Sequence, residues 1–195
     1  MDATHEQALS EAELLAAVAA GDRRSFEQLY RIYEARVFHY IRTFVSDRAV
    51  ADEVLVEVMV SVWQGAKTFR HISRVSTWIL GIARHKALDA VRRTGRQQHG
   101  RVDLEEIADV ADPADGAAEG ADQRKLAALT RRALAKLSRE HEEIIRLAFY
   151  EELPYEEISA LLDIPVNTVK TRVFYAKRQL KQHLTTLMHG ESCDA

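Results

Sequence analysis

The residues with the clearest chemistry are polar and cationic side chains in one stretch near the C-terminus. Between Ile164 and Leu184 there are five Lys or Arg residues and no acid. Apolar residues recur there at spacings of three and four, which predicts a helix with one buried face. The opposite face carries groups that can hydrogen-bond bases and phosphates, namely Thr168, Lys170, Thr171, Arg172, Tyr175, Lys177 and Arg178.

A second, shorter helix must position this cationic helix. Tyr155 to Leu162 is amphipathic, and Asp163–Ile164–Pro165 makes a tight break before the basic helix begins. Residues 153–184 therefore predict a helix-turn-helix, whose second helix is suited to the major groove of DNA. For an isolated helix pair, an ordinary basic surface helix of an all-α protein is the alternative.

Another basic block lies in the N-terminal half. From Gly65 to Arg96, eight Lys or Arg residues face the single acid Asp89. Residues 67–74 lack apolar periodicity and predict a basic loop, and residues 75–93 predict a helix in which Trp78 lies among cations. A solvated basic face is the alternative. His85 and Asp89, four residues apart, are interpreted as a surface pair rather than a metal or acid/base pair.

An acidic segment separates the two basic blocks. Residues 97–123 hold eight Asp or Glu residues and one cation, Arg101, with Pro113 and three glycines among them. This composition predicts a flexible linker and a domain boundary. We therefore expect an N-terminal domain over residues 1–96, a linker over 97–122, a helix-turn-helix domain over 123–190 and a tail over 191–195.

The remaining pattern is helical. Ser10 and Glu13 predict a capping box, and Asp22 predicts the cap of a long helix. A helix starting at Ser46 or Asp47 and ending near Gly65 is apolar nearly all round, so it is either buried or docks a partner. Its stripes are Val54, Val58 and Val62 on one side and Val56, Met59, Val60 and Trp63 on the other. With no strand-like alternation, the fold class is all-α, with two small helical domains.

Composition excludes several classes. The only cysteine, Cys193, cannot form an intrachain disulfide, and His183, His189 and Cys193 lack the paired spacing of zinc ligands. We find no signal peptide and no apolar run long enough to insert in a membrane, so we expect a cytoplasmic protein. The absence of a P-loop, G-x-G-x-x-G and HExxH argues against an enzyme, and no cofactor or metal is expected.

In order and sequence, these parts resemble the sigma-70-type initiation factors of bacterial RNA polymerase, specifically the small extracytoplasmic-function (ECF) group. The resemblance covers roughly residues 10–187. The segments GDRRSFEQLY, ADEVLVEVMVSVW and STWILGIARHKALDAVRR are similar to region 2 of that family. The segment LSREHEEIIRLAFYEELPYEEISALLDIPVNTVKTRVFYAKRQL is similar to region 4, and its helix-turn-helix part is the more specific match.

The resemblance implies a promoter-specificity factor with two DNA contacts. Region 4 would bind the −35 element through the recognition-helix residues named above together with Asn167. Region 2 would capture the melted −10 element, and its candidate residues are Lys67, Phe69, Arg70, His71, Arg74, Trp78, Arg84, His85, Arg92 and Arg93.

The resemblance also implies protein partners. Core polymerase would be bound through the clamp helices of its largest subunit and the flap of its second. The candidate docking residues for the clamp are Asp52, Glu53, Val56, Glu57, Val60 and Trp63. An anti-sigma factor is a further implied partner, and a stand-alone helix-turn-helix regulator remains the alternative function.

The chain departs from the family pattern at several positions. Val56 and Met59 stand where Gln and Phe are usual, and Ser61 replaces a basic residue. His85 replaces the usual asparagine, and Asn167 a common glycine. The more apolar second face of the candidate docking helix, with Val56 and Val60, predicts a hydrophobic partner.

Overall fold

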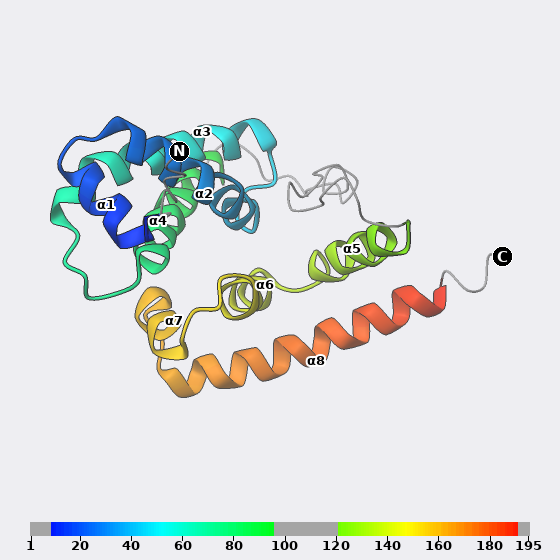
Figure 1. Ribbon diagram of the computed structural model, residues 1–195. Helices are drawn as coiled ribbons and strands as arrows, with labels where there is room; N and C mark the ends of the chain where they lie inside the picture. Colours follow the sequence, from blue (N-terminus) through cyan, green and yellow to red (C-terminus); the bar gives the residue numbers. More distant parts are fainter. Residues whose placement is uncertain (1–8, 96–120, 191–195) are drawn as a thin grey trace, which may run out of the picture.

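A computed structural model describes residues 9–95 and 121–190, and every regular element in these ranges is helical. The N-terminal unit and the C-terminal unit follow one another along the chain and lie side by side (Figure 1). The N-terminal unit contains α1 (Glu11–Ala19), α2 (Arg23–Arg42), α3 (Arg48–Gly65), the 3₁₀ turn η1 (Ala66–Thr68) and α4 (Val75–Gly95). The C-terminal unit contains α5 (Ala121–Leu134), α6 (Arg139–Ile145), the π-helical turn η3 (Arg146–Tyr150), α7 (Tyr155–Leu162) and α8 (Val166–Gly190).

Side-chain caps set the helix starts that the sequence predicts. The Ser10 side chain accepts from the Glu13 N–H, and the Glu13 carboxylate accepts from the Ser10 N–H, which completes the capping box of α1. Asp22 and Asp47 each accept backbone N–H bonds in the first turn of α2 and α3. Ser138 does the same for α6.

The core of the N-terminal unit comes from one face of each long helix. Tyr33, Val37 and Ile41 of α2 are fully buried, as are Val58 of α3 and Ile79 of α4. Removing this much apolar surface from water is the main favourable contribution to folding of such a unit. It also fixes which faces of α3 and α4 point outward.

In the C-terminal unit, α8 runs along the whole unit and α5 packs against its C-terminal half (Figure 1). Val169, Val173, Ala176 and Leu187 of α8 are buried. These are four of the seven positions in the predicted stripe of α8, and they turn the polar face of the helix outward.

Four details differ from the prediction. The helix expected over residues 75–93 extends to Gly95, and α5 begins at Ala121, inside the expected linker. The spacing of Ile144, Ile145, Ala148 and Phe149 predicts one amphipathic helix, but the helix that begins at Arg139 widens into the π turn η3, where Phe149 is 43% exposed. Met59 is 3% exposed, so it belongs to the core and not to the outer stripe of α3. The rest of the predicted linker lies outside the described residues.

Candidate nucleic-acid interface

The turn between α7 and α8 has a strained residue that the fold holds in place. Asp163 ends α7 in the left-handed conformation, with φ of +55°. The Ile164 N–H donates to the Ser159 carbonyl at 3.1 Å, and the Ser159 hydroxyl donates to the Ile164 carbonyl at 2.6 Å. These two bonds satisfy backbone groups that the end of α7 leaves open. They fix the direction in which α8 departs from α7.

The predicted recognition residues lie on the outer part of α8. Asn167, Lys170, Thr171, Tyr175, Lys177 and Arg178 are exposed, and Thr168 and Arg172 are half-buried. Arg172 Nη2 lies 3.7 Å from Glu140 Oε2 of α6. Lys177 Nζ lies 4.3 Å from the centre of the Phe149 ring, a cation–π contact that orients the amine.

One exposed aromatic residue on α8 escaped the sequence analysis. Phe174 is 64% exposed, and its ring meets that of Tyr175 edge-on at 5.5 Å. The available signal was its position outside the buried stripe of Val169, Val173 and Ala176. An apolar ring on this face can contact a thymine methyl group.

The loop before α4 is held by an aromatic stack. The Phe69 ring lies 4.7 Å from the His71 ring and 5.3 Å from the Trp78 ring. His71 has a positive φ of 56°, a conformation that costs a non-glycine residue free energy unless its surroundings hold it. Lys67, Arg70 and Arg74 are exposed around this stack. The loop thus presents cations beside aromatic rings, as predicted.

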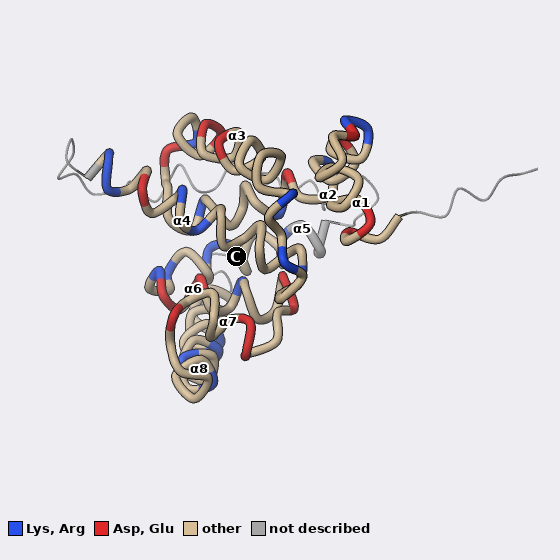
Figure 2. The backbone as a smooth tube through the Cα atoms, turned by 90° about the vertical axis from the view of Figure 1, so that its left-hand side faces the viewer, with Lys and Arg blue, Asp and Glu red and all other residues tan. Residues whose placement is uncertain are grey.

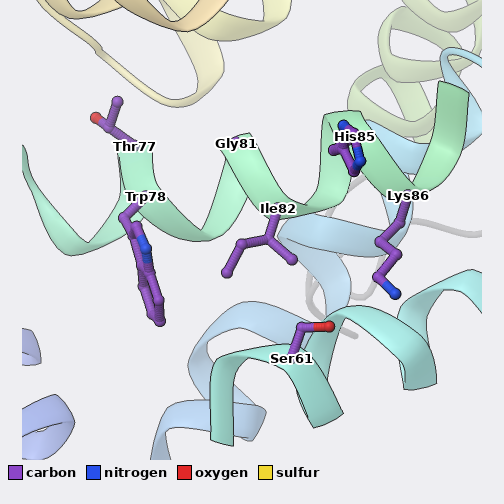
Figure 3. Close-up of a pocket in the computed structure, with 7 residues that line it drawn as sticks. All are labelled: Ser61, Thr77, Trp78, Gly81, Ile82, His85 and Lys86. Carbon is purple, nitrogen blue, oxygen red and sulfur yellow. The ribbon is translucent and has the colours of Figure 1, made fainter. Parts of the chain in front are cut away.

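A shallow groove of about 470 Å³ lies along α3 and α4, with Trp78, Ile82 and Lys86 directed toward Ser61 of α3 (Figure 3). His85 also lines it, so two of the seven residues that line the groove, Trp78 and His85, are predicted site residues. The Ser61 hydroxyl donates to the Glu57 carbonyl at 2.9 Å and is therefore not a free donor.

The cations of α4 are paired with carboxylates. Arg92 and His85 lie 3.2 and 3.4 Å from Asp89, and Arg93 and Lys86 lie 3.4 and 3.5 Å from Glu57. Arg84 Nε donates to Glu143 Oε1 of α6 at 2.9 Å. Because Glu143 of the C-terminal unit accepts from Arg84 Nε, this donor is not available to another ligand in this arrangement.

The outer face of α3 carries the predicted docking residues. Val56 and Val60 are 58% and 47% exposed, and Asp52 and Glu53 are exposed nearby. Trp63 is half-buried and packs edge-on against Phe26 at 5.1 Å. Its indole therefore also belongs to the packing between α2 and α3.

Two buried tyrosines of α2 donate hydrogen bonds to carboxylates. Burial raises the pKa of Tyr40 well above its ordinary value. The nearby negative charge of Glu143, whose carboxylate accepts a hydrogen bond from the Tyr40 hydroxyl at 2.8 Å, raises this pKa further. Burial likewise raises the pKa of Tyr33, whose hydroxyl donates to Glu11 at 2.6 Å. Both phenols stay protonated donors at physiological pH.

Among the described residues, no three His, Cys, Asp or Glu side chains gather closely enough to hold a metal ion. Cys193, one of the three ligands considered above, lies outside them. None of the helices in the described ranges has the length and apolar character that a bilayer crossing requires.

Comparison with known proteins identifies both units. Residues 29–97 match Sigma-70 region 2, and residues 128–180 match Sigma-70, region 4. The ECF RNA polymerase sigma factor SigM of Mycobacterium tuberculosis is 31% identical over 186 residues, which are 95% of this chain and 89% of SigM. The chain belongs to the ECF group of sigma-70 factors. The ECF factor RpoE of Cereibacter sphaeroides is 27% identical over 84% of this sigma factor and 88% of RpoE.

Solved structures share the fold of this sigma factor. RpoE of Bartonella quintana, in complex with the anti-sigma factor NepR, aligns with a TM-score of 0.66 at 21% identity, over 83% of this chain and 98% of RpoE. CnrH, in complex with the cytosolic domain of CnrY, aligns with a TM-score of 0.63 at 21% identity, over 90% of this chain and 97% of CnrH. The all-α prediction is thereby confirmed.

Proposed function

We propose that this sigma factor directs core RNA polymerase to promoters of a stress- or signal-responsive gene set, reading the −35 element with α8 and holding the opened −10 strand with α4 and the loop before it. The observation that carries the proposal is the outer face of α8, which is cationic and free of acids, whereas Val169, Val173 and Ala176 on the opposite face are buried. A solvated basic helix explains the charge but not its position after a fixed turn.

The residues of α8 divide between base reading and backbone binding. Lys170 and Arg172 would hydrogen-bond guanine edges in the major groove, and Thr168 and Thr171 would contact bases or phosphates. Tyr175, Lys177 and Arg178 would hold the backbone, and Asn167 lies at the start of the helix. Thr171 already donates its hydroxyl to the Asn167 carbonyl at 2.9 Å, which leaves its oxygen lone pairs for DNA.

The aromatic loop supports capture of an unpaired base. Extruding a base costs a few kcal/mol, and stacking on an aromatic ring returns about 1–3 kcal/mol per base. Phe69, His71 and Trp78 supply the rings, and Lys67 and Arg70 supply positive charge for the adjoining phosphates. This contact would begin at Arg74, directly before α4, and extend along α4 through Arg84, His85, Arg92 and Arg93.

Core polymerase would bind the outer face of α3. The exposed pair Val56 and Val60 gives that face an apolar centre, and Asp52, Glu53 and Glu57 give it an acidic edge. Trp63 would contribute through its exposed part. This docking, and not catalysis by the chain, would start transcription, so the protein itself would not act as an enzyme.

Promoter binding requires the two units to separate. The −35 and −10 elements are centred about 25 base pairs apart, which is roughly 85 Å of B-form duplex. The units touch one another here, and α8 is only about 37 Å long. We therefore assign residues 1–96 and 123–190 to separate domains, with residues 97–122 as their tether.

The two solved relatives suggest a partner that controls this separation. RpoE of B. quintana is bound to an anti-sigma factor, and CnrH to the cytosolic domain of CnrY. An anti-sigma factor would hold this protein inactive in the cytoplasm until its signal arrives.

The test is run-off transcription with core polymerase on a library of genomic fragments. We expect transcripts that share a two-part upstream motif. If core polymerase is not stimulated and the chain shifts duplex promoter DNA alone, the protein is a stand-alone helix-turn-helix regulator.

A further inference from the structure

The boundary between the two units contains two carboxylates that are almost completely buried. Glu143 of α6 has a side-chain exposure of 7% and accepts bonds from Tyr40 at 2.8 Å and Arg84 at 2.9 Å. Glu151, which follows η3, has a side-chain exposure of 4% and accepts two bonds from Arg36, at 2.7 and 3.0 Å. Every donor comes from the N-terminal unit, so these bonds exist only while the units are in contact.

A third carboxylate extends the boundary toward the loop. Glu157 of α7 accepts the hydroxyl of Thr77 and lies 3.6 Å from Arg74 Nε. Arg74 also donates to the Glu152 carbonyl at 3.3 Å. Charged segments of both signs line the boundary in Figure 2. We call Glu143, Glu151 and Glu157 the carboxylate clasp.

Two of the cations that the clasp holds are needed elsewhere. Arg84 and Arg74 belong to the −10 contact under the proposed function, on which this inference rests. A carboxylate binds a guanidinium through the same donors that a phosphate uses, so one guanidinium cannot serve both fully. We propose that the carboxylate clasp is a built-in inhibitor, which holds the sigma factor closed by occupying Arg74 and Arg84 in place of DNA phosphate.

The physics of buried pairs makes this clasp reversible. Removing one partner of a buried ion pair is costly when the other charge stays buried without a partner. Separation of the units avoids this cost, because both partners return to water. DNA then supplies new anions to Arg74 and Arg84. Under this inference, the closed state predominates without DNA and polymerase and is displaced when they bind.

The test changes the clasp at a residue outside the DNA contact. Glu151→Arg puts a cation against Arg36, whereas Glu156→Arg adds the same charge at an exposed site of α7 that forms no ion pair within the described residues. Small-angle scattering gives the separation of the units, and anisotropy of a degenerate single-stranded 20-mer reports the −10 surface. We expect Glu151→Arg to have a larger radius of gyration than Glu156→Arg. We also expect it to bind the 20-mer at least about fivefold more tightly than Glu156→Arg does, because fivefold is the lower end of the coupling usually found between two sites.

Unchanged scattering, or opening without tighter binding of the 20-mer, would overturn the inference. Retained binding of Glu151→Arg to a promoter duplex from the transcription experiment shows that α8 is still folded. Failure of the wild type to stimulate core polymerase would instead reject the proposed function, whatever the clasp does.

A second experiment locks the units together. An ideal Cβ at Gly81 would lie 3.4 Å from Leu161 Cδ1, so cysteines at both positions, with Cys193→Ser, are within reach of a short thiol crosslinker. We expect the crosslinked protein to lose at least about fivefold in 20-mer affinity relative to the same variant without crosslinker. Equal affinity of the two forms would show that the closed arrangement does not block the −10 surface.

Discussion

The cations of α4 and those of α8 are in opposite states. Arg84, Lys86, Arg92 and Arg93 of α4 each form an ion pair with a carboxylate. On α8, Arg172 alone among its described Lys and Arg residues is paired with a carboxylate, at 3.7 Å. The reason lies in the neighbours, because α4 has Asp89, Glu57 and Glu143 within reach whereas α8 carries no acid of its own.

Under the proposed function, this difference predicts that the two surfaces bind DNA in different ways. The α8 surface can exchange its counterions for phosphates directly, which is the usual source of salt-dependent affinity. The cations of α4 must first give up carboxylates, and one of them, Arg84, is released only when the units separate. We infer that −35 binding is intrinsic to the C-terminal unit, whereas −10 binding is conditional.

The largest expected effect is on polymerase docking, which under the proposed function uses α3 and neither of the two charged surfaces. Replacing Val56 and Val60 by Gln removes the apolar centre of the α3 face, and burying a valine is worth up to about 1.5–3 kcal/mol. We expect core-polymerase affinity to fall by about 10–100-fold, measured by fluorescence titration, with duplex binding unchanged.

Leu126→Gln is the matched control, because Leu126 of α5 is a 57% exposed apolar residue in the other unit. Unchanged affinity of the Val56/Val60 variant would place the polymerase contact away from this face of α3.

The next effect tests base reading on α8. Arg172→Ala should cost about 1–3 kcal/mol of discrimination if its guanidinium binds a guanine edge in a bidentate way. Lys177→Ala should weaken all sequences alike and lower the salt slope by about one. Binding assays on matched and mismatched −35 duplexes at several salt concentrations distinguish the two. Equal loss on every duplex for Arg172→Ala would assign it to the phosphate backbone.

The sequence was sufficient for the parts of this molecule that local rules determine. Ser10, Asp22 and Asp47 cap helices because their oxygens satisfy N–H groups a few residues away, and such bonds depend on short spacings. The bounds of α7 were also predicted correctly, since an amphipathic period followed by a break before Pro165 defines them.

Features that join distant residues were not predictable in the same way. The partners of Glu143 and Glu151 are 59 to 115 residues away in the chain, and no periodicity links them. The sequence analysis placed Met59 in one stripe with Val56 and Val60, but Met59 is buried and the two valines are exposed. Because α3 is apolar nearly all round, its pattern does not reveal which residues face the core. The roles of the candidate DNA residues remain predictions, because base contacts depend on how the protein docks.

A smaller effect measures the one ion pair on α8. Glu140 is 65% exposed at its side chain and lies 3.7 Å from Arg172, so this pair is worth less than about 1 kcal/mol. Glu140→Gln should therefore raise −35 affinity by no more than about fivefold, mainly at low salt. Glu156→Gln on α7 serves as the control for loss of one negative charge. A larger gain for Glu140→Gln would mean that α8 is inhibited as strongly as α4.

The smallest expected effect is a difference between the two units in how folding stability depends on pH. Hydrogen bonds from the side chain and backbone of Ser25 lower the pKa of Asp22 from 3.8, so its contribution to stability is present above that pH and is lost on acidification. Burial raises the pKa of Glu142 from 4.5, although Arg146 at 3.5 Å opposes the shift. The Glu142 contribution is therefore fullest below pH 4.5 and is lost as pH rises through the raised pKa.

The two neutral variants should consequently differ in sign. At pH 7, Asp22→Asn should unfold more easily than the wild type, and Glu142→Gln should unfold less easily, because the amide removes a buried charge and still accepts a bond from Arg146. Both differences should shrink as pH falls toward 4, measured by urea unfolding at each pH. Destabilisation by Glu142→Gln at pH 7 would mean that its attraction to Arg146 outweighs the cost of burial, and the contrast between the units would then disappear.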